Sequence, residues 1–220
     1  MEEAQEKTEK SENTQEEAEI KEALSYYESG AARQKAHMKN GLLHGECVAY
    51  YESGQIQQES YFADGKLNGE CVSYNEQGNV SNKSNFKQDK LHGKATHYYQ
   101  NSKVMSEGEY VEGMLEGKLI TYNEQGDMTA EMEYKANTLH GESKYFNNDG
   151  DVAKLSSYEN GLLHGPVIDY YPSGSAFREF NYKTGVLDGE QLVFYENGNL
   201  QEESVYENGE IKSGPERHAL

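Results

Sequence analysis

Four of the seven histidines recur at multiples of one spacing, each between a leucine and a glycine. They are His44, His92, His140 and His164. Histidine is a common zinc ligand, but ligands that share an ion must approach it to about 2 Å. Equivalent positions in neighbouring β-hairpins lie two strands apart, or about 9–10 Å. We therefore expect no metal at these histidines and no cofactor.

Other polar residues occupy the same column as the histidines. Asn68, Glu116 and Asp188 stand where the repeats at 44, 92, 140 and 164 carry histidine. Asn, Asp and His tolerate a positive φ better than most residues, which predicts a structural role for this column. Glu116 does not fit that explanation.

The sequence offers little catalytic chemistry. Cys47 and Cys71 are one 24-residue period apart, and the resulting separation of about 10 Å exceeds the limit of about 7 Å between the Cα atoms of a disulfide. Two free cysteines favour a reducing compartment. There is no nucleophile elbow, phosphate-binding loop or dinucleotide fingerprint, and the carboxylates are dispersed over polar positions. We predict that the chain is not an enzyme.

A line of tyrosines offers binding chemistry instead. Its members are Tyr27, Tyr51, Tyr99, Tyr171 and Tyr195, and Asn75, Asn123 and Asn147 fill the gaps. Each follows a main aromatic column by one residue, which predicts that it points to the opposite face of a sheet. Four glutamates lie beside this line, at Glu28, Glu52, Glu124 and Glu196. One interpretation is cross-strand packing on the less-buried face; the other is an exposed surface that binds a basic partner.

These residues belong to a repeat of 24 residues. Seven glycines keep the spacing without insertion or deletion: Gly45, Gly69, Gly93, Gly117, Gly141, Gly165 and Gly189. The main aromatic column is Tyr26, Tyr50, Tyr74, Tyr98, Tyr122, Phe146, Tyr170 and Phe194. A second aromatic column runs from Phe62 to Tyr206. Several columns in one register predict eight tandem repeats over residues 22–213.

Each repeat has the pattern of a β-hairpin. Apolar residues alternate with a period of 2, and pairs such as Ser53-Gly54 suit two-residue turns. The second connection, after Phe62, is too short for a helix, so all neighbouring strands should be antiparallel. The predicted fold is all-β, an elongated single sheet in which about sixteen short strands form a β-meander solenoid. We expect Leu67 and Tyr50, with their columns, to be buried.

The ends of the chain differ from the repeats. Residues 1–21 are acidic; we expect disorder to about residue 13, then a short helix over residues 14–24 that covers the edge of the first strand. Residues 214–220 should form a C-terminal tail. No apolar run approaches the roughly 20 residues that span a membrane, and no secretory signal follows Met1. We expect a cytoplasmic protein, or an exported one if a signal peptide has been removed.

The formal net charge of −19 limits the kinds of partner. It opposes binding to nucleic acid and to anionic membranes, and it favours a basic protein partner. We expect a monomer.

The repeat motif resembles a known family. Residues 158–165 read Tyr-Glu-Asn-Gly-Leu-Leu-His-Gly, and residues 195–198 read Tyr-Glu-Asn-Gly. Repeats of this form resemble MORN repeats, in the variant seen in bacterial proteins called YwqK-like antitoxins. The resemblance covers residues 22–213 and implies a binding or assembly module. The antitoxin label implies a protein that binds and neutralises a toxin.

Three hypotheses follow for the function. The first is a non-catalytic protein-interaction scaffold, including an antitoxin or immunity-type inhibitor that binds a basic protein. The second is a structural protein that assembles through its sheet edges. The third is a MORN array that binds lipid or a membrane surface, which the negative charge opposes.

Overall fold

A computed structural model describes residues 19–219 of the chain as one sheet of seventeen β-strands. The strands are β1 (Lys21–Tyr26), β2 (Ala32–Lys39), β3 (Leu42–Tyr50), β4 (Ile56–Ala63), β5 (Lys66–Tyr74), β6 (Val80–Lys87), β7 (Lys90–Tyr98), β8 (Val104–Val111), β9 (Met114–Tyr122), β10 (Met128–Lys135), β11 (Thr138–Phe146), β12 (Val152–Glu159), β13 (Leu162–Tyr170), β14 (Ala176–Lys183), β15 (Val186–Phe194), β16 (Leu200–Glu207) and β17 (Glu210–Arg217).

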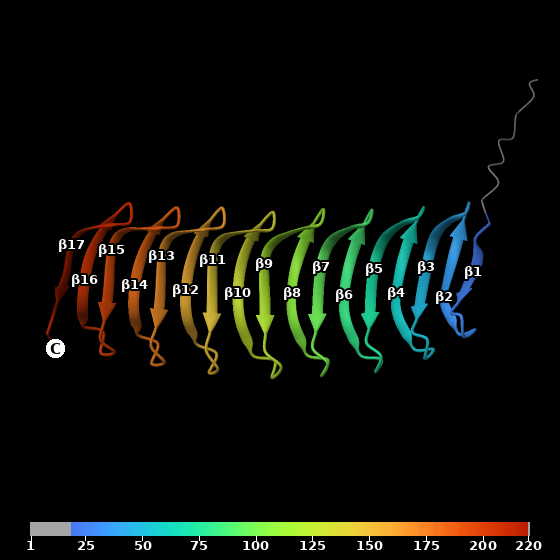
Figure 1. The fold of residues 1–220 in the computed structure, drawn as a ribbon, viewed down its shortest axis with the longest axis horizontal. Coiled ribbons are helices and arrows are strands. Elements are labelled where there is room, and N and C mark those ends of the chain that lie inside the picture. The colour runs from blue at the N-terminus through green and yellow to red at the C-terminus, as the bar shows by residue number, and fades with distance from the viewer. Residues whose placement is uncertain (1–18, 220) are drawn as a thin grey trace, which may run out of the picture.

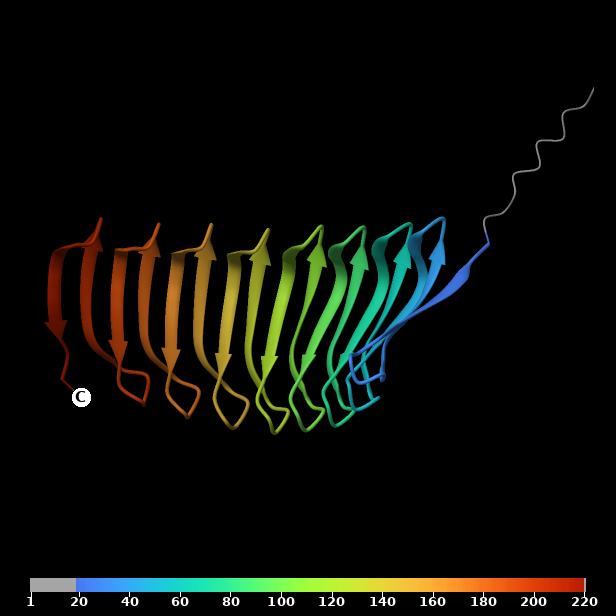
Figure 2. The ribbon, with the colours of Figure 1, turned by 45° about the vertical axis from the view of Figure 1, so that its right-hand side comes forward.

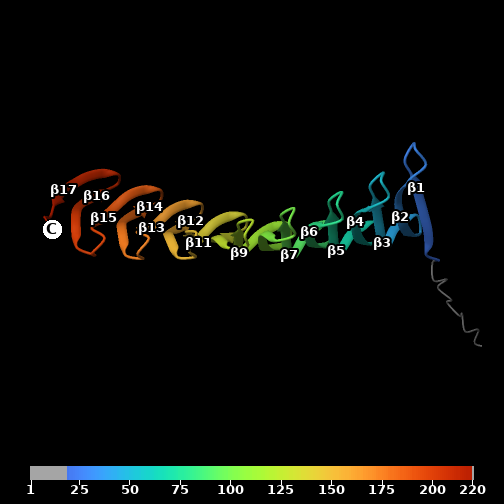
Figure 3. The same ribbon diagram turned by 90° about the horizontal axis from the view of Figure 1, so that it is seen from below.

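Each strand pairs antiparallel with the next strand in the sequence. The result is an open, elongated sheet that runs in chain order from β1 to β17 (Figure 1). The strands are bowed and the sheet twists along its length (Figures 2 and 3). The predicted all-β meander is confirmed.

The ends of the sheet correct two expectations. The helix predicted over residues 14–24 is wrong from residue 19 onward, because residues 19–20 have no regular secondary structure and β1 begins at Lys21. Residues 14–18 and the segment expected to be disordered lie outside the described residues. β17 continues to Arg217, so most of the expected tail belongs to a strand. All residues of β1 and β17 are exposed, because each has a neighbouring strand on one side only.

The two kinds of turn are the reverse of those predicted. The two-residue turn is Asp64-Gly65, where φ is 50° and 81°, the type I′ geometry that matches the twist of the strands. Ser53-Gly54 instead lies within the five-residue loop 51–55, which is closed by hydrogen bonds from the Tyr51 nitrogen to the Gln55 oxygen and from the Gly54 nitrogen to the Tyr51 oxygen, each 2.8 Å. Gly54 does have the predicted positive φ, at 88°.

The glycine of the Leu-x-Gly motif lies at a β-bulge. In the β4–β5 pair, Ser60 faces Cys71 and Phe62 faces Leu67, so the register shifts between them. Gly69 adopts a φ of 130° at this irregularity, a conformation that residues other than glycine rarely tolerate. The same glycine recurs every 24 residues because every repeat carries the same bulge.

One face of the sheet, here the core face, carries a continuous row of small residues at the middle of the strands. Cross-strand partners follow one another from Ala36 to Cys47, Ser60, Cys71, Ser84, Ala95 and Gly108. These side chains are 3–6 % exposed apart from the glycine, which is also buried. A single sheet has no second layer, so the residues of this row are buried because they are short enough to be covered by their neighbours.

Long side chains flank this row and are less buried than predicted. Phe62 and Leu67 lie on the core face and are half-buried, as are most members of their columns; Leu115, at 7 % exposure, is the exception. The expectation that the Leu67 and Tyr50 columns are buried therefore holds only in part. Their exposure follows from the absence of a layer packed above them.

The two aromatic columns lie on opposite faces. Glu59 and Ser60 are neighbours on β4, so they point to opposite sides, and Tyr74 donates a hydrogen bond of 2.6 Å to the Glu59 carboxylate. The column of Tyr74 is therefore on the second face, here the charged face. The bond to Glu59 raises the pKa of the Tyr74 phenol to about 12. Two ion pairs add further charged side chains to this face: Lys83 with Glu70 at 2.7 Å, and Lys118 with Glu131 at 2.8 Å.

Candidate protein-binding site

The candidate binding residues lie along one edge of the sheet. The five-residue loops, of which 51–55 is an example, form the lower edge in Figure 1, and the two-residue turns form the upper edge. Tyr51 is the first residue of its loop and Glu52 the second. This tyrosine line therefore lies in the loops beyond the strand ends, and not within the strands as the alternating pattern assumed.

The tyrosines of this line tie each loop to the next repeat. The Tyr51 hydroxyl donates to the carbonyl oxygen of Tyr74, 23 residues later, at 2.7 Å. The same bond, at 2.6–3.2 Å, joins Tyr27 to Tyr50, Tyr99 to Tyr122, Tyr171 to Phe194 and Tyr195 to His218. The tyrosine side chains are half-buried. They fix the spacing of the loops, a role that neither interpretation from the sequence included.

Asparagine replaces the tyrosine in three loops, where its side chain bonds to the backbone of its own loop. The Asn75 Oδ1 atom accepts hydrogen bonds from the backbone nitrogens of Gln77 and Asn79, at 3.1 and 3.0 Å. Asn123 and Asn147 do the same in their loops, at 2.9–3.0 Å. Asparagine and tyrosine thus both order the loop, but through different hydrogen bonds.

Removing one tyrosine tether should loosen its loop. Tyr51→Phe keeps the ring and loses the bond to the Tyr74 carbonyl, so we expect the free energy of unfolding to fall by about 0.5–1.5 kcal/mol. Amide exchange should rise in loop 51–55. Tyr61→Phe is the matched control, because Tyr61 is 49 % exposed; it should change neither quantity, and an equal effect of both substitutions would argue against the tether.

The described loop carboxylates have no ion-pair partner, whereas many of the strand carboxylates do. The ion pairs of residues 19–219 involve carboxylates of strands, turns and the first described residues, such as Glu107 with Lys94 at 2.5 Å. None involves a carboxylate of the five-residue loops in that part of the chain. The four predicted loop glutamates are exposed: Glu28, Glu52, Glu124 and Glu196.

The predicted set of loop glutamates was incomplete. Glu76 occupies the same position in loop 75–79 and is equally exposed. The residue before it is Asn75 and not a tyrosine, which is why Glu76 was left out. The period of 24 alone could have identified Glu76. Lys103 is a basic loop residue, but its Nζ atom donates to the Gln125 carbonyl oxygen of the next loop.

Three members of the histidine column accept hydrogen bonds from the two-residue turns along the opposite edge. The Asp64 backbone nitrogen lies 3.4 Å from His44 Nδ1, and the Ala136 nitrogen lies 2.9 Å from a carboxylate oxygen of Glu116. Asp188 accepts from Asn208 in the same way, at 3.1 Å. In these three repeats the residue acts as an acceptor, a role that Glu116 can fill, whereas His92 Nδ1 and His140 Nδ1 have no hydrogen-bond partner among the described residues. The positive-φ explanation was wrong, because that conformation belongs to the following glycine.

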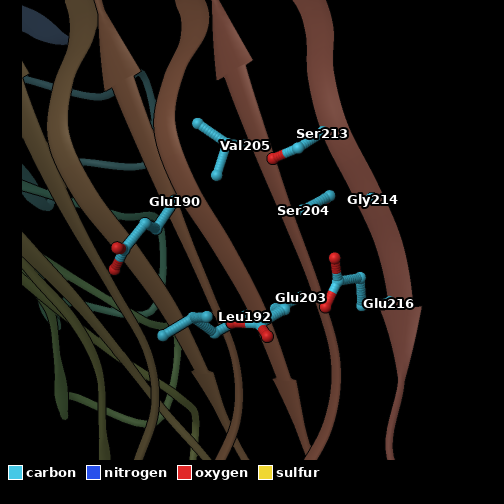
Figure 4. A pocket seen from close by; sticks show the side chains of 8 residues that line it. All are labelled: Glu190, Leu192, Glu203, Ser204, Val205, Ser213, Gly214 and Glu216. Atoms are coloured by element: carbon cyan, nitrogen blue, oxygen red, sulfur yellow. The ribbon is translucent and has the colours of Figure 1, made fainter.

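The described residues contain no group of three His, Cys, Asp or Glu side chains arranged to hold a metal. Cys47 and Cys71 are free, buried and separated by β4, and burial raises the pKa of the Cys71 thiol. Glu190, Glu203 and Glu216 line a shallow hollow at the β17 end (Figure 4). Nothing in the described residues arranges these carboxylates as a ligand set.

Comparison with known families identifies the repeat. Residues 43–64, 67–88, 91–112, 139–160 and 187–208 match the family described as MORN repeat variant. These five segments make up half of the 220-residue chain. The chain belongs to the MORN repeat variant family. Each matched MORN segment runs from the leucine before the bulge, through one five-residue loop, to the first residue of the next two-residue turn.

Other comparisons add little to the MORN assignment. No curated protein matches the chain. A Photorhabdus luminescens Tc holotoxin pore is 12 % identical over 84 % of this chain and 13 % of that chain, with a TM-score of 0.20. A porin-like protein from Bacteroides uniformis is 12 % identical over 88 % of this chain and 86 % of its own, with a TM-score of 0.21. Scores this low support no argument about the MORN array. Within residues 19–219 no helix could span a membrane.

Proposed function

We propose that this chain is a non-catalytic scaffold that binds a basic protein segment along its row of five-residue loops, here the loop edge. MORN repeats are generally associated with protein or membrane binding, and their all-β repeat fold is typically non-catalytic. The observation that carries the proposal is a row of exposed glutamates that share one loop position along one edge and have no ion-pair partner among residues 19–219, whereas many strand carboxylates are paired with a cation. A cationic partner can replace water around the loop carboxylates without breaking an existing ion pair.

The loop spacing suggests the form of that segment. Successive loops are two strands apart, or about 9.6 Å. A polyproline II segment rises about 3.1 Å per residue and has three residues per turn, so it repeats every 9.3 Å or so. Lysine or arginine at every third position would then meet Glu28, Glu52 and Glu76 in succession. The tyrosine tethers help this match because they hold the loops in place before binding.

A labelled peptide with lysine at every third position tests this proposal. We expect it to bind more tightly than a peptide of the same composition with its lysines in one block, and its affinity to fall as salt rises. An acidic peptide of equal length is the negative control. Equal affinity for the two lysine peptides would contradict the spacing, and no binding of either at low salt would contradict the proposed function.

The antitoxin role is a narrower form of this proposal. The basic partner would then be a toxin that the array covers and inhibits. Co-expression with a candidate toxin should restore growth, and substitution of the loop glutamates by glutamine should abolish that protection while the protein remains folded.

Edge-to-edge assembly receives less support. With seventeen strands that pair antiparallel in order, β1 and β17 run in the same direction (Figure 1). Head-to-tail joining would place β17 of one copy parallel to β1 of the next and would break the antiparallel pattern. Pro215 in β17 also lacks the amide hydrogen that a new partner strand would need. We therefore propose a monomer.

The net charge of −19 argues against the lipid-binding alternative. Flotation with anionic liposomes would test it, and we expect the protein to stay with the soluble fraction.

A further inference from the structure

Three of the two-residue turns have the sequence Asn-Gly and the same backbone geometry. They are Asn40-Gly41, Asn160-Gly161 and Asn208-Gly209. The asparagine φ values are 52°, 50° and 51°, and the glycine φ values are 78°, 81° and 83°. Any difference in their chemistry must therefore come from what surrounds each turn.

Two of these turns are held by the preceding repeat. The Gly161 nitrogen donates to the Leu139 carbonyl oxygen and the Gly209 nitrogen to that of Leu187, both at 2.8 Å. Side chains also cover the glycines: a Cβ atom on Gly161 would lie 3.2 Å from Thr138 Cγ2, and one on Gly209 would lie 3.5 Å from Val186 Cγ1.

The first turn lacks both restraints among residues 19–219. No backbone partner of the Gly41 nitrogen occurs there, and nothing lies within 4 Å of the position of a Gly41 Cβ atom. A hollow lined by Glu19, Lys21 and Met38 adjoins the turn. The reason is positional: the leucine that holds each later turn belongs to the repeat before it, and only β1 precedes the two strands, β2 and β3, that this turn joins.

We propose that Asn40 is a site of spontaneous deamidation. The deprotonated Gly41 nitrogen attacks the Asn40 side-chain carbonyl carbon, and a C–N bond forms as the bond to the side-chain nitrogen breaks. Ammonia leaves, and the resulting succinimide takes up one water molecule. Opening at one carbonyl gives aspartate, and opening at the other gives isoaspartate.

The restraints matter because the reaction needs the turn to open. The glycine nitrogen must leave its turn geometry to reach the side-chain carbon, so the rate depends on the population of a locally opened state. The hydrogen bond from Gly161 or Gly209 and the side chain above it must be lost during that opening. Within residues 19–219, opening of the Asn40-Gly41 turn breaks no such hydrogen bond and uncovers no such side chain of a preceding repeat. Isoaspartate would also add a methylene to a two-residue turn and place a carboxylate at the β1 end of the array.

Incubation of the folded protein in mildly alkaline buffer, followed by peptide mapping with mass spectrometry, tests the proposal. The three sites are compared in the same molecule, with Asn40→Asp as a reference for one product. We expect Asn40 to react about tenfold faster than Asn160 or Asn208, the factor expected for loss of about one hydrogen bond. In denaturant the three rates should converge, because all three are followed by glycine.

A second variant removes a restraint instead of the reactive residue. Val186→Ala uncovers Gly209 and should raise the rate at Asn208 several-fold without changing the rate at Asn40 or Asn160. If Asn40 remains intact in the folded protein, or reacts no faster than Asn160 and Asn208, the proposal is wrong.

Discussion

Truncation of Leu115 to alanine is expected to lower the free energy of unfolding by about 2–5 kcal/mol. Leu115 is 7 % exposed, whereas most leucines of its column are only half-buried. It fills the space above Gly108, where a Cβ atom would lie 2.9 Å from Leu115 Cδ1. Because the sheet has one layer, no side chain from another layer can move in to fill the cavity. Chemical denaturation followed by circular dichroism measures the loss.

The neighbouring residue provides the control for this prediction. Met114 is 42 % exposed and lies immediately before Leu115 on β9. Met114→Ala should cost less than about 1 kcal/mol, since its side chain is already largely in water. Equal costs for the two substitutions would show that the core is not where the burial pattern places it.

Neutralising the loop carboxylates should slow partner binding strongly. The variant Glu28→Gln, Glu52→Gln, Glu124→Gln and Glu196→Gln removes four negative charges from one edge. We expect the association rate of the lysine peptide to fall about tenfold or more at low salt, and the effect to shrink at high salt. Stopped-flow fluorescence measures both. Stability should be unchanged, because none of the four belongs to an ion pair in residues 19–219.

A second variant separates local recognition from net charge. Glu46→Gln, Glu109→Gln, Glu179→Gln and Glu190→Gln change the charge by the same amount, but these residues lie on β3, β8, β14 and β15. They too have no ion-pair partner among the described residues. We expect at most a small decrease in the association rate. If both variants slow binding equally, only the total charge matters and the loop edge has no special role.

The sequence predicted the fold because the repeat is regular in every column. One period of 24 determines where each strand begins, and the short connections leave only antiparallel neighbours. The turn types were not predictable in the same way. Ser53-Gly54 and Asp64-Gly65 are both residue pairs that suit a type I′ turn, and only the length of the strands around them decides which one closes tightly.

The candidate binding residues were chosen from the sequence pattern, but their place in the loops was not predicted. An alternating pattern continued through Tyr50 and Tyr51 assigns them to opposite faces, but the strand ends at Tyr50. The bond from the Tyr51 hydroxyl to Tyr74 joins residues 23 apart, so no pattern within one repeat could reveal it. The acceptor role of Glu116 was hidden for the same reason, because its partner Ala136 lies 20 residues away.

Zero-length carbodiimide crosslinking of the lysine peptide to the protein tests the central claim, that the loop edge is the binding site, most directly. The reagent joins a lysine amine to a carboxylate only where the two are in contact, and mass spectrometry locates each link. We predict links at Glu28, Glu52, Glu76, Glu124 and Glu196, and their loss at high salt. Links concentrated on the strand carboxylates Glu46, Glu109 and Glu190 would contradict the account and would place the binding surface on the face of the sheet.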